Sequence, residues 1–225
     1  MASAKTGGDG RLLRADFHVH TAFSKDCETP LEELISRCQE TNINCIAVSD
    51  HGNIEGALKI QSMAPFKVII AEEILTHSGE IMGMFLKEGI PSHISLDEAV
   101  ARIKEQNALI CLPHPYDPLR GLKLDANQME KLAGQVDIIE VFNARSPFFK
   151  PARQARELAL KHNLGETVGS DAHHLKEIGH NYVEMPDFNG KDEFLEALRE
   201  GKQTRHRSSV LVHFRTVWIK AKRLF

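Results

Sequence analysis

The sequence predicts an α/β fold, a distorted (β/α)7 TIM-like barrel in a single domain. Short apolar segments rich in Val, Ile and Phe alternate along the chain with amphipathic segments, a pattern typical of parallel strands joined by crossover helices. About seven strand units can be counted, which favours a closed or nearly closed barrel over an open sheet. The length of 225 residues fits one such domain.

The order of elements begins with a β-α-β unit. A strand is expected over 12–20 and another over 43–51. The helix between them is expected to begin at Thr29-Pro30, with the acidic residues Glu32 and Glu33 in its first turn, because proline and carboxylates are favoured at helix N-termini.

Five further strands are expected after this unit. They cover 66–73, 80–86, 108–114, 136–144 and 165–172. Two helix signals lie between them: Ser95-Leu96-Asp97-Glu98 forms a capping box before 99–106, and Ala, Arg, Glu and Leu dominate 147–161. We therefore expect parallel strands with crossover helices in a barrel domain spanning residues 12–207.

The composition is ordinary for a soluble globular protein. Apolar residues make up 42% of the chain, charged residues 26%, and the formal net charge of −3 argues for no particular partner. No apolar run approaches the roughly 20 residues of a membrane helix, and residues 1–11 read as a flexible tail without the features of a secretion signal. The cysteines form no C-x-x-C pair, so free thiols and a cytoplasmic location are expected.

Two histidines close the first predicted strand. In Asp16-Phe17-His18-Val19-His20, the period-two alternation of a strand puts both imidazoles on one face, where they can hold one ion. Such a pair is weak evidence alone, because histidines with ordinary hydrogen-bond partners are common at strand ends.

Four other predicted strands also end in segments that contain His, Asp or Glu, the residue types that bind metals. These segments are Ser49-Asp50-His51, Glu72-Glu73, Pro113-His114-Pro115 and Ser170-Asp171-Ala172-His173. Because the carboxyl ends of barrel strands meet at one mouth, these side chains are expected to converge there. The sequence therefore predicts a metal site.

Five motifs resemble those of the polymerase-and-histidinol-phosphatase (PHP) domain. They are H-x-H-T-x-x-S from His18, S-D-H, a glutamate on the third strand, P-H-P, and a terminal S-D-A-H. Their order and spacing agree with that family over about residues 14–200. The segments from Glu73 through Glu80 to MGMFL, then LPHPYDPLR and EVFNAR, are similar to a small stand-alone phosphoesterase-like branch.

The resemblance implies a trinuclear site that holds two or three divalent ions (Mn, Zn or Fe). One ion would be held by His18, His20, Glu73 and Asp171. Glu73 would bridge to a second ion completed by Glu80 and His114, and a third would be held by Asp26, His51 and His173. Three cations bring about +6 against four carboxylates, leaving a mouth of about +2 that attracts phosphate.

Two positions depart from the usual pattern of the family, and a third leaves a choice of bridging ligand. Glu80 stands where many members have histidine, and a carboxylate there favours a harder ion such as manganese over zinc. Glu72 is adjacent to Glu73 and competes with it for the bridging role, although the spacing favours Glu73. Ala71 stands where many members carry glycine.

The implied activity is that of a phosphoesterase that hydrolyses a phosphomonoester or a small nucleotide-type phosphodiester with metal-activated water. Arg145 and Arg120 follow strand-end motifs, where each is a candidate for binding phosphate or for an ordinary surface ion pair. Asp50 is expected to orient a ligand imidazole or to carry a proton.

Two alternative functions stay open. An amidohydrolase-like barrel also begins with H-x-H and ends with an aspartate, but it acts on C–N bonds and usually bridges its metals with a carboxylated lysine. The second alternative is a non-enzymatic, metal-binding regulatory domain.

The expected partner of the protein is a small phosphorylated substrate. No stable nucleic-acid partner is expected.

The C-terminal residues 208–225 predict a basic amphipathic helix. From Gly201 onward the chain has seven Lys or Arg residues and no acidic residue, and its apolar residues recur at helical spacing. The apolar stripe is expected to dock on the barrel, and the alternative is a weak contact with a membrane surface or a protein.

Overall fold

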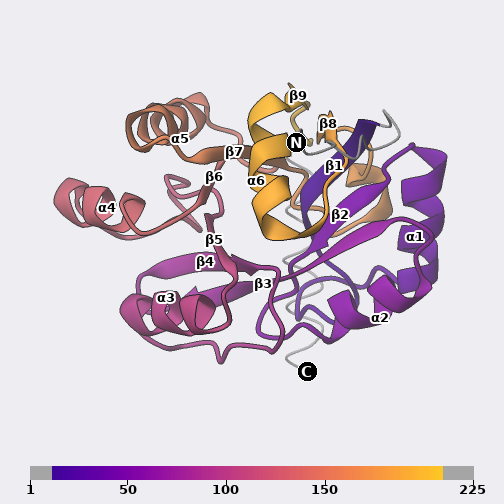
Figure 1. Cartoon of the computed structure of the whole chain (residues 1–225), viewed down its shortest axis with the longest axis horizontal. Helices are drawn as coiled ribbons and strands as arrows, with labels where there is room; N and C mark the ends of the chain where they lie inside the picture. Colours follow the sequence, from indigo (N-terminus) through magenta and orange to yellow (C-terminus); the bar gives the residue numbers. More distant parts are fainter. Residues whose placement is uncertain (1–11, 210–225) are drawn as a thin grey trace, which may run out of the picture.

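The computed structural model describes residues 12–209. The predicted N-terminal tail, 1–11, and nearly all of the predicted C-terminal helix, 208–225, lie outside the described residues. The predicted α/β barrel is confirmed, because the strands form a nearly closed, barrel-shaped sheet with helices around it (Figure 1).

The described residues contain nine strands in one continuous sheet, in the order β7-β6-β5-β4-β3-β2-β1-β8-β9. Their bounds are β1 Leu12–Val19, β2 Cys45–Val48, β3 Lys67–Thr76, β4 Gly79–Met84, β5 Leu109–Leu112, β6 Ile138–Asn143, β7 Gly165–Gly169, β8 Tyr182–Pro186 and β9 Lys202–Thr204. The ends of β7 and β1 approach each other, since His20 N donates to Ala172 O at 3.0 Å. This contact nearly closes the barrel.

The prediction of parallel strands throughout is wrong at β4. This strand pairs antiparallel with both β3 and β5, whereas β1–β2, β2–β3, β5–β6 and β6–β7 are parallel. The physical reason is the length of the connection. Only His77 and Ser78 separate β3 from β4, and Gly79 has a φ of +117°, so the chain makes a hairpin and has no room for a crossover helix.

Helices cover the outside of the sheet. Their bounds are α1 Leu31–Glu40, α2 Glu55–Met63, α3 Leu96–Glu105, α4 Ala126–Ala133, α5 Phe149–His162 and α6 Gly190–Glu200, with a 3₁₀ turn at Leu175–Glu177. Figure 1 shows α1 and α2 beside β2 and β3, α3 beside β4, and α4 and α5 beyond β5 and β6. The predicted cap of α3 is present, because the Ser95 side chain accepts a hydrogen bond from Glu98 N.

Three elements after β7 were not predicted. β8 pairs antiparallel with β1 and with β9, and α6 packs against β7 and β8. Phe194 of α6 is fully buried and meets Phe17 of β1 edge to face, with ring centroids 5.3 Å apart. β8 pairs with Leu12–Ala15 in the N-terminal part of β1. The C-terminal end of β1, which carries His18, therefore stays open to the site. Within residues 12–209, no helix combines the length and apolar character needed to cross a membrane.

Candidate metal centre

The structure places all nine predicted ligands at one mouth of the barrel. His18 lies in β1, Glu73 in β3 and Glu80 in β4, and the others lie in loops that follow β1, β2, β5 and β7. Glu80 reaches the same mouth because it pairs with Leu75 near the carboxyl end of β3. Most of these side chains are buried, so burial and mutual charge dominate their chemistry.

The first group of side chains comes from β1 and the loop that follows it, from β3, and from the loop after β7. His18 Nε2 lies 3.1 Å from His20 Nε2 and 3.2 Å from Glu73 Oε2. Asp171 Oδ1 lies 3.7 Å from His18 Nε2 and 3.5 Å from His20 Nε2. Four side chains therefore direct ligand atoms at one small volume.

The second group shares Glu73 with the first. Glu73 Oε2 faces His18 and His20, while its Oε1 lies 3.0 Å from His114 Nε2. His114 Nε2 is also 3.7 Å from Glu80 Oε2. The two oxygens of one carboxylate thus face two different groups, as the bridging position requires.

Glu72 is turned away from this cluster. Its Oε2 accepts a hydrogen bond from Ile90 N at 2.8 Å, and the side chain is buried under the segment after β4. Neighbouring residues of a strand face opposite sides. Of the two adjacent glutamates, Glu73 is therefore the one that faces the histidines.

The third group forms around Asp26. Its Oδ2 lies 3.5 Å from His51 Nε2, and its Oδ1 lies 3.3 Å from His173 Nε2. The ring of His173 is fixed from the other side, where Nδ1 lies 2.8 Å from the carbonyl oxygen of Asp171. Ser24 Oγ donates to Asp26 Oδ1 at 2.7 Å and holds that carboxylate.

The electrostatics of the cluster favour bound positive charge. Burial lowers the pKa of His20, but its hydrogen bonds to Asp171 and Glu73 outweigh that effect and raise the pKa to about 9. Burial and the charge of Glu73 together raise the pKa of the Glu80 carboxyl to about 7. The carboxylates of the mouth therefore stabilise protons or cations held among them.

The donor set fits divalent metal ions. Two imidazole nitrogens only 3.1 Å apart, His18 Nε2 and His20 Nε2, are aimed at the same carboxylate oxygen. Imidazole and carboxylate ligands suit manganese, iron and zinc. Four sets of candidate ligand atoms lie within 4.8 Å of one another, namely His20, Asp26, His51 and His173; His18, His20 and Glu73; His51, Glu73 and Glu80; and His18, His114 and Glu140.

Within residues 12–209, the carboxylate of Asp50 is hydrogen-bonded to Thr21 and not to an imidazole. Its two oxygens accept from Thr21 N and Thr21 Oγ1, both at 2.6 Å. Gly56 packs against it, because a Cβ at that position would overlap the Asp50 carboxylate. Asp50 therefore holds the loop that follows His20, and its roles in orienting a ligand imidazole or in carrying a proton stay predictions.

The two predicted arginines occupy different positions. Arg120 lies at the mouth with its side chain 27% exposed, where it pairs with Asp171 and donates to Asn143 Oδ1 at 3.2 Å. Arg145 is buried, and its Nε lies 3.6 Å from Glu177 Oε1. Of these two arginines, Arg120 is therefore the one that lies at the cluster and is partly open to solvent.

Glu140, Asn143 and Glu177 also support the site, and the sequence reasoning missed them. Glu140 Oε1 lies 3.1 Å from His18 Nδ1, and Asn143 Nδ2 donates to Asp171 Oδ2 at 3.2 Å. Glu177 Oε2 accepts from His173 N at 3.0 Å. A signal for Glu140 was available, because a charged residue inside the apolar strand segment IIEVF is rarely buried without partners.

A family model described as PHP-associated matches residues 151–203. An uncharacterized protein of Methanocaldococcus jannaschii is 36% identical over 197 residues, which are 83% of this chain and 79% of that protein. A solved two-domain protein of Bacteroides vulgatus that contains a predicted PHP-like metal-dependent phosphoesterase has a TM-score of 0.71 at 20% identity, covering 87% of this chain and 65% of that one. The chain belongs to the PHP-domain family.

The fold of this chain is also similar to that of the solved structure of PsfC from Pseudomonas syringae. The TM-score is 0.62 at 16% identity, and the match covers 94% of this chain and 99% of the other. The PHP-associated match includes β8, α6 and the first two residues of β9, the elements that the strand and helix signals did not reveal. The present chain spans about two thirds of the two-domain protein of Bacteroides vulgatus.

Proposed function

We propose that this PHP-domain protein is a metal-dependent phosphoesterase that hydrolyses a phosphomonoester or a small nucleotide-type phosphodiester. The observation that carries the proposal is the position of Glu73, whose two oxygens face two separate groups of imidazole and carboxylate ligands. This arrangement uses a glutamate where an amidohydrolase-like site usually has a carboxylated lysine. It therefore supports phosphate ester hydrolysis over the C–N alternative.

Nine side chains would hold the ions in this proposal. His18, His20, Glu73 and Asp171 would hold the first, Glu73, Glu80 and His114 the second, and Asp26, His51 and His173 the third. When bound, divalent ions of this kind lower the pKa of a coordinated water toward neutrality and stabilise charge on phosphoryl oxygens. No side-chain nucleophile is needed.

Arg120 is the residue that we propose for binding the phosphate. Burial lowers the pKa of its guanidinium, but the charges of Asp171 and Asp117 outweigh this and raise it, so the group stays cationic. Its pairing with Asp171 and Asn143 fixes the planar fork at the mouth, a geometry suited to two phosphoryl oxygens. We propose a different role for Arg145, which is buried and contacts Glu177. It would hold the segment that carries Asp171 and His173, because its guanidinium donates to the carbonyl oxygen of Asp171.

The experiment is a screen of phosphate esters on protein whose metal content has been measured. Purified protein loaded with manganese, zinc or iron is tested against phosphomonoesters and small phosphodiesters, with a parallel panel of C–N substrates. Phosphate release that depends on added metal supports the proposal. A fully loaded protein that releases no phosphate, or that instead cleaves a C–N bond, contradicts it.

A further inference from the structure

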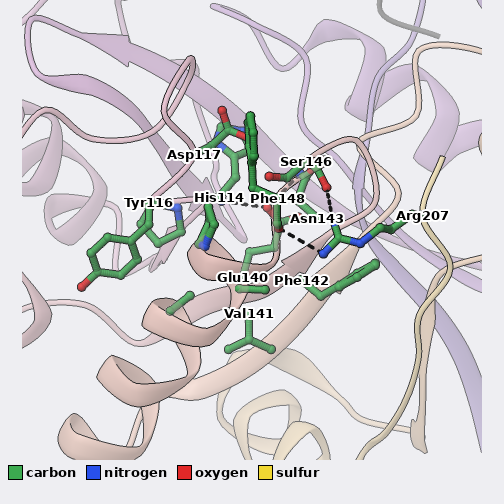
Figure 2. A pocket seen from close by; sticks show the side chains of 14 residues that line it. His114, Tyr116, Asp117, Glu140, Val141, Phe142, Asn143, Ser146, Phe148 and Arg207 are labelled. Carbon is green, nitrogen blue, oxygen red and sulfur yellow. Dashed lines mark hydrogen bonds between the residues drawn. The ribbon is translucent and has the colours of Figure 1, made fainter. Parts of the chain in front are cut away.

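Glu140 places a buried carboxylate directly behind the metal-facing histidines. It lies in the middle of β6, is 3% exposed, and has the buried residues Ile139 and Val141 as neighbours. Figure 2 shows Glu140 with His114 and Asn143 in the wall of a small pocket beside the mouth. A charge this deeply buried is costly unless it is fully hydrogen-bonded.

Three hydrogen bonds satisfy the carboxylate of Glu140. Its Oε1 lies 3.1 Å from His18 Nδ1, and its Oε2 accepts from His114 N at 2.8 Å and from Asn143 Nδ2 at 3.0 Å. All three partners are themselves buried. One side chain therefore contacts a residue of the first group, a residue of the second, and the asparagine that binds Arg120.

The neighbouring strand leaves space for this contact. Gly169 of β7 lies against Glu140, and a Cβ at that position would overlap Glu140 Oε1 and come within 2.5 Å of His18 Cβ. Any larger residue at 169 would therefore push the carboxylate or the imidazole out of place.

We propose that Glu140 is a positioning residue that keeps the proton of His18 on Nδ1 and fixes the backbone of His114, so that Nε2 of both rings faces the cations. A neutral imidazole carries one proton, and a carboxylate that accepts from Nδ1 leaves the lone pair on Nε2. His18 Nε2 is the atom directed at Glu73 and Asp171. His114 has a φ of +28°, and its N–H is held by Glu140.

Glu140 is a partner of the ligands and is not itself a ligand. A carboxylate oxygen of Glu140 does lie within 4.8 Å of ring nitrogens of His18 and His114, and these nitrogens lie within 4.8 Å of each other. However, both oxygens of Glu140 already accept hydrogen bonds, and Oε1 faces Nδ1 of His18, while the opposite nitrogen, Nε2, faces the carboxylates of the mouth. The contact is therefore a direct hydrogen bond with no space for an ion between its atoms.

The substitution Glu140→Gln tests this role with almost no change in shape. A glutamine has one oxygen and one NH₂ group, whereas Glu140 accepts hydrogen bonds at both oxygens. If the NH₂ faces His18, Nδ1 must accept, and the proton moves to Nε2. If the NH₂ faces His114 N and Asn143 Nδ2, donors oppose donors. The first orientation removes the lone pair of His18 Nε2, and the second breaks the hydrogen bonds to His114 N and Asn143 Nδ2.

The matched control is Glu72→Gln. Glu72 is also a buried strand glutamate with a backbone hydrogen bond, to Ile90 N, but it faces away from the cluster. Both variants are titrated with Mn²⁺ by calorimetry, and the Nδ1–H signal of His18 is followed by ¹⁵N NMR in zinc-loaded protein. We expect Glu140→Gln to bind Mn²⁺ about 10- to 100-fold more weakly and to lose that signal, while Glu72→Gln behaves as wild type.

The proposal is overturned if Glu140→Gln keeps wild-type Mn²⁺ affinity and the His18 signal, or if Glu72→Gln loses as much affinity. Should Glu140→Gln fail to fold, Glu140→Asp provides the same test, because its carboxylate is one methylene too short to reach both histidines. These measurements need no turnover. A wild-type protein without phosphoesterase activity would contradict the proposed function and leave the comparison of metal affinities intact.

Discussion

Replacing Glu73 by glutamine should remove most of the stabilisation that metal ions give to the folded protein. The substitution keeps the shape of the side chain and removes the carboxylate that faces Nε2 of both His18 and His114. The variant would retain only the group of Asp26, His51 and His173 with its full set of ligands. Two of the three ions should therefore bind much more weakly.

The size of the effect follows from ligand linkage. An ion at about 100 times its Kd stabilises the native state by about 2.7 kcal/mol. For a chain of this length, each kcal/mol corresponds to about 2–4 °C in Tm, so each ion should raise Tm by roughly 5–11 °C. In Glu73→Gln, about two thirds of the rise seen in the wild type should disappear.

The assay is differential scanning calorimetry of metal-free protein before and after addition of manganese. Glu72→Gln serves as the control, because Glu72 has similar burial but faces Ile90. An equal rise in Tm in wild type and Glu73→Gln would refute the assignment of Glu73 as the shared ligand. A loss confined to Glu72→Gln would show that the other glutamate has that role.

Three further predictions concern the same mouth. His18→Ala or Asp171→Ala should abolish phosphate release while circular dichroism keeps the wild-type spectrum, since the barrel core does not depend on its mouth ligands; wild-type turnover in either variant would contradict the site. Arg120→Ala should raise KM by about tenfold or more through loss of a charged phosphate contact, and an unchanged KM would remove Arg120 from substrate binding. Glu80→His should shift the preferred ion from manganese toward zinc, measured as metal content after equal exposure to both, and an unaltered ratio would argue against Glu80 as a ligand.

The barrel and the position of the site could be predicted because both depend on local periodicity. Alternation in the first strand puts His18 and His20 on one face, and the carboxyl ends of parallel strands share one mouth. The direction of β4 depended instead on a connection of only two residues. The sequence analysis treated this strand like its neighbours, although even the six residues between the two expected strands, 74–79, are too few for a crossover helix.

The supporting residues were harder to predict from sequence. Glu140 lies inside an apolar strand segment, and only the fold shows that it meets His18 across the barrel. Arg120 and Arg145 have similar contexts in the sequence, yet one lies at the mouth and the other is buried against Glu177. The paths of the loops that carry them depend on tertiary packing, which local sequence patterns do not determine.

The most direct test of the account is metal content and phosphate-ester hydrolysis measured on one sample of the wild-type protein. We expect two or three divalent ions per chain, with phosphate release that disappears on chelation and returns when the metal is restored. A protein that binds no divalent ion, or that releases phosphate equally well after complete removal of metal, would contradict it.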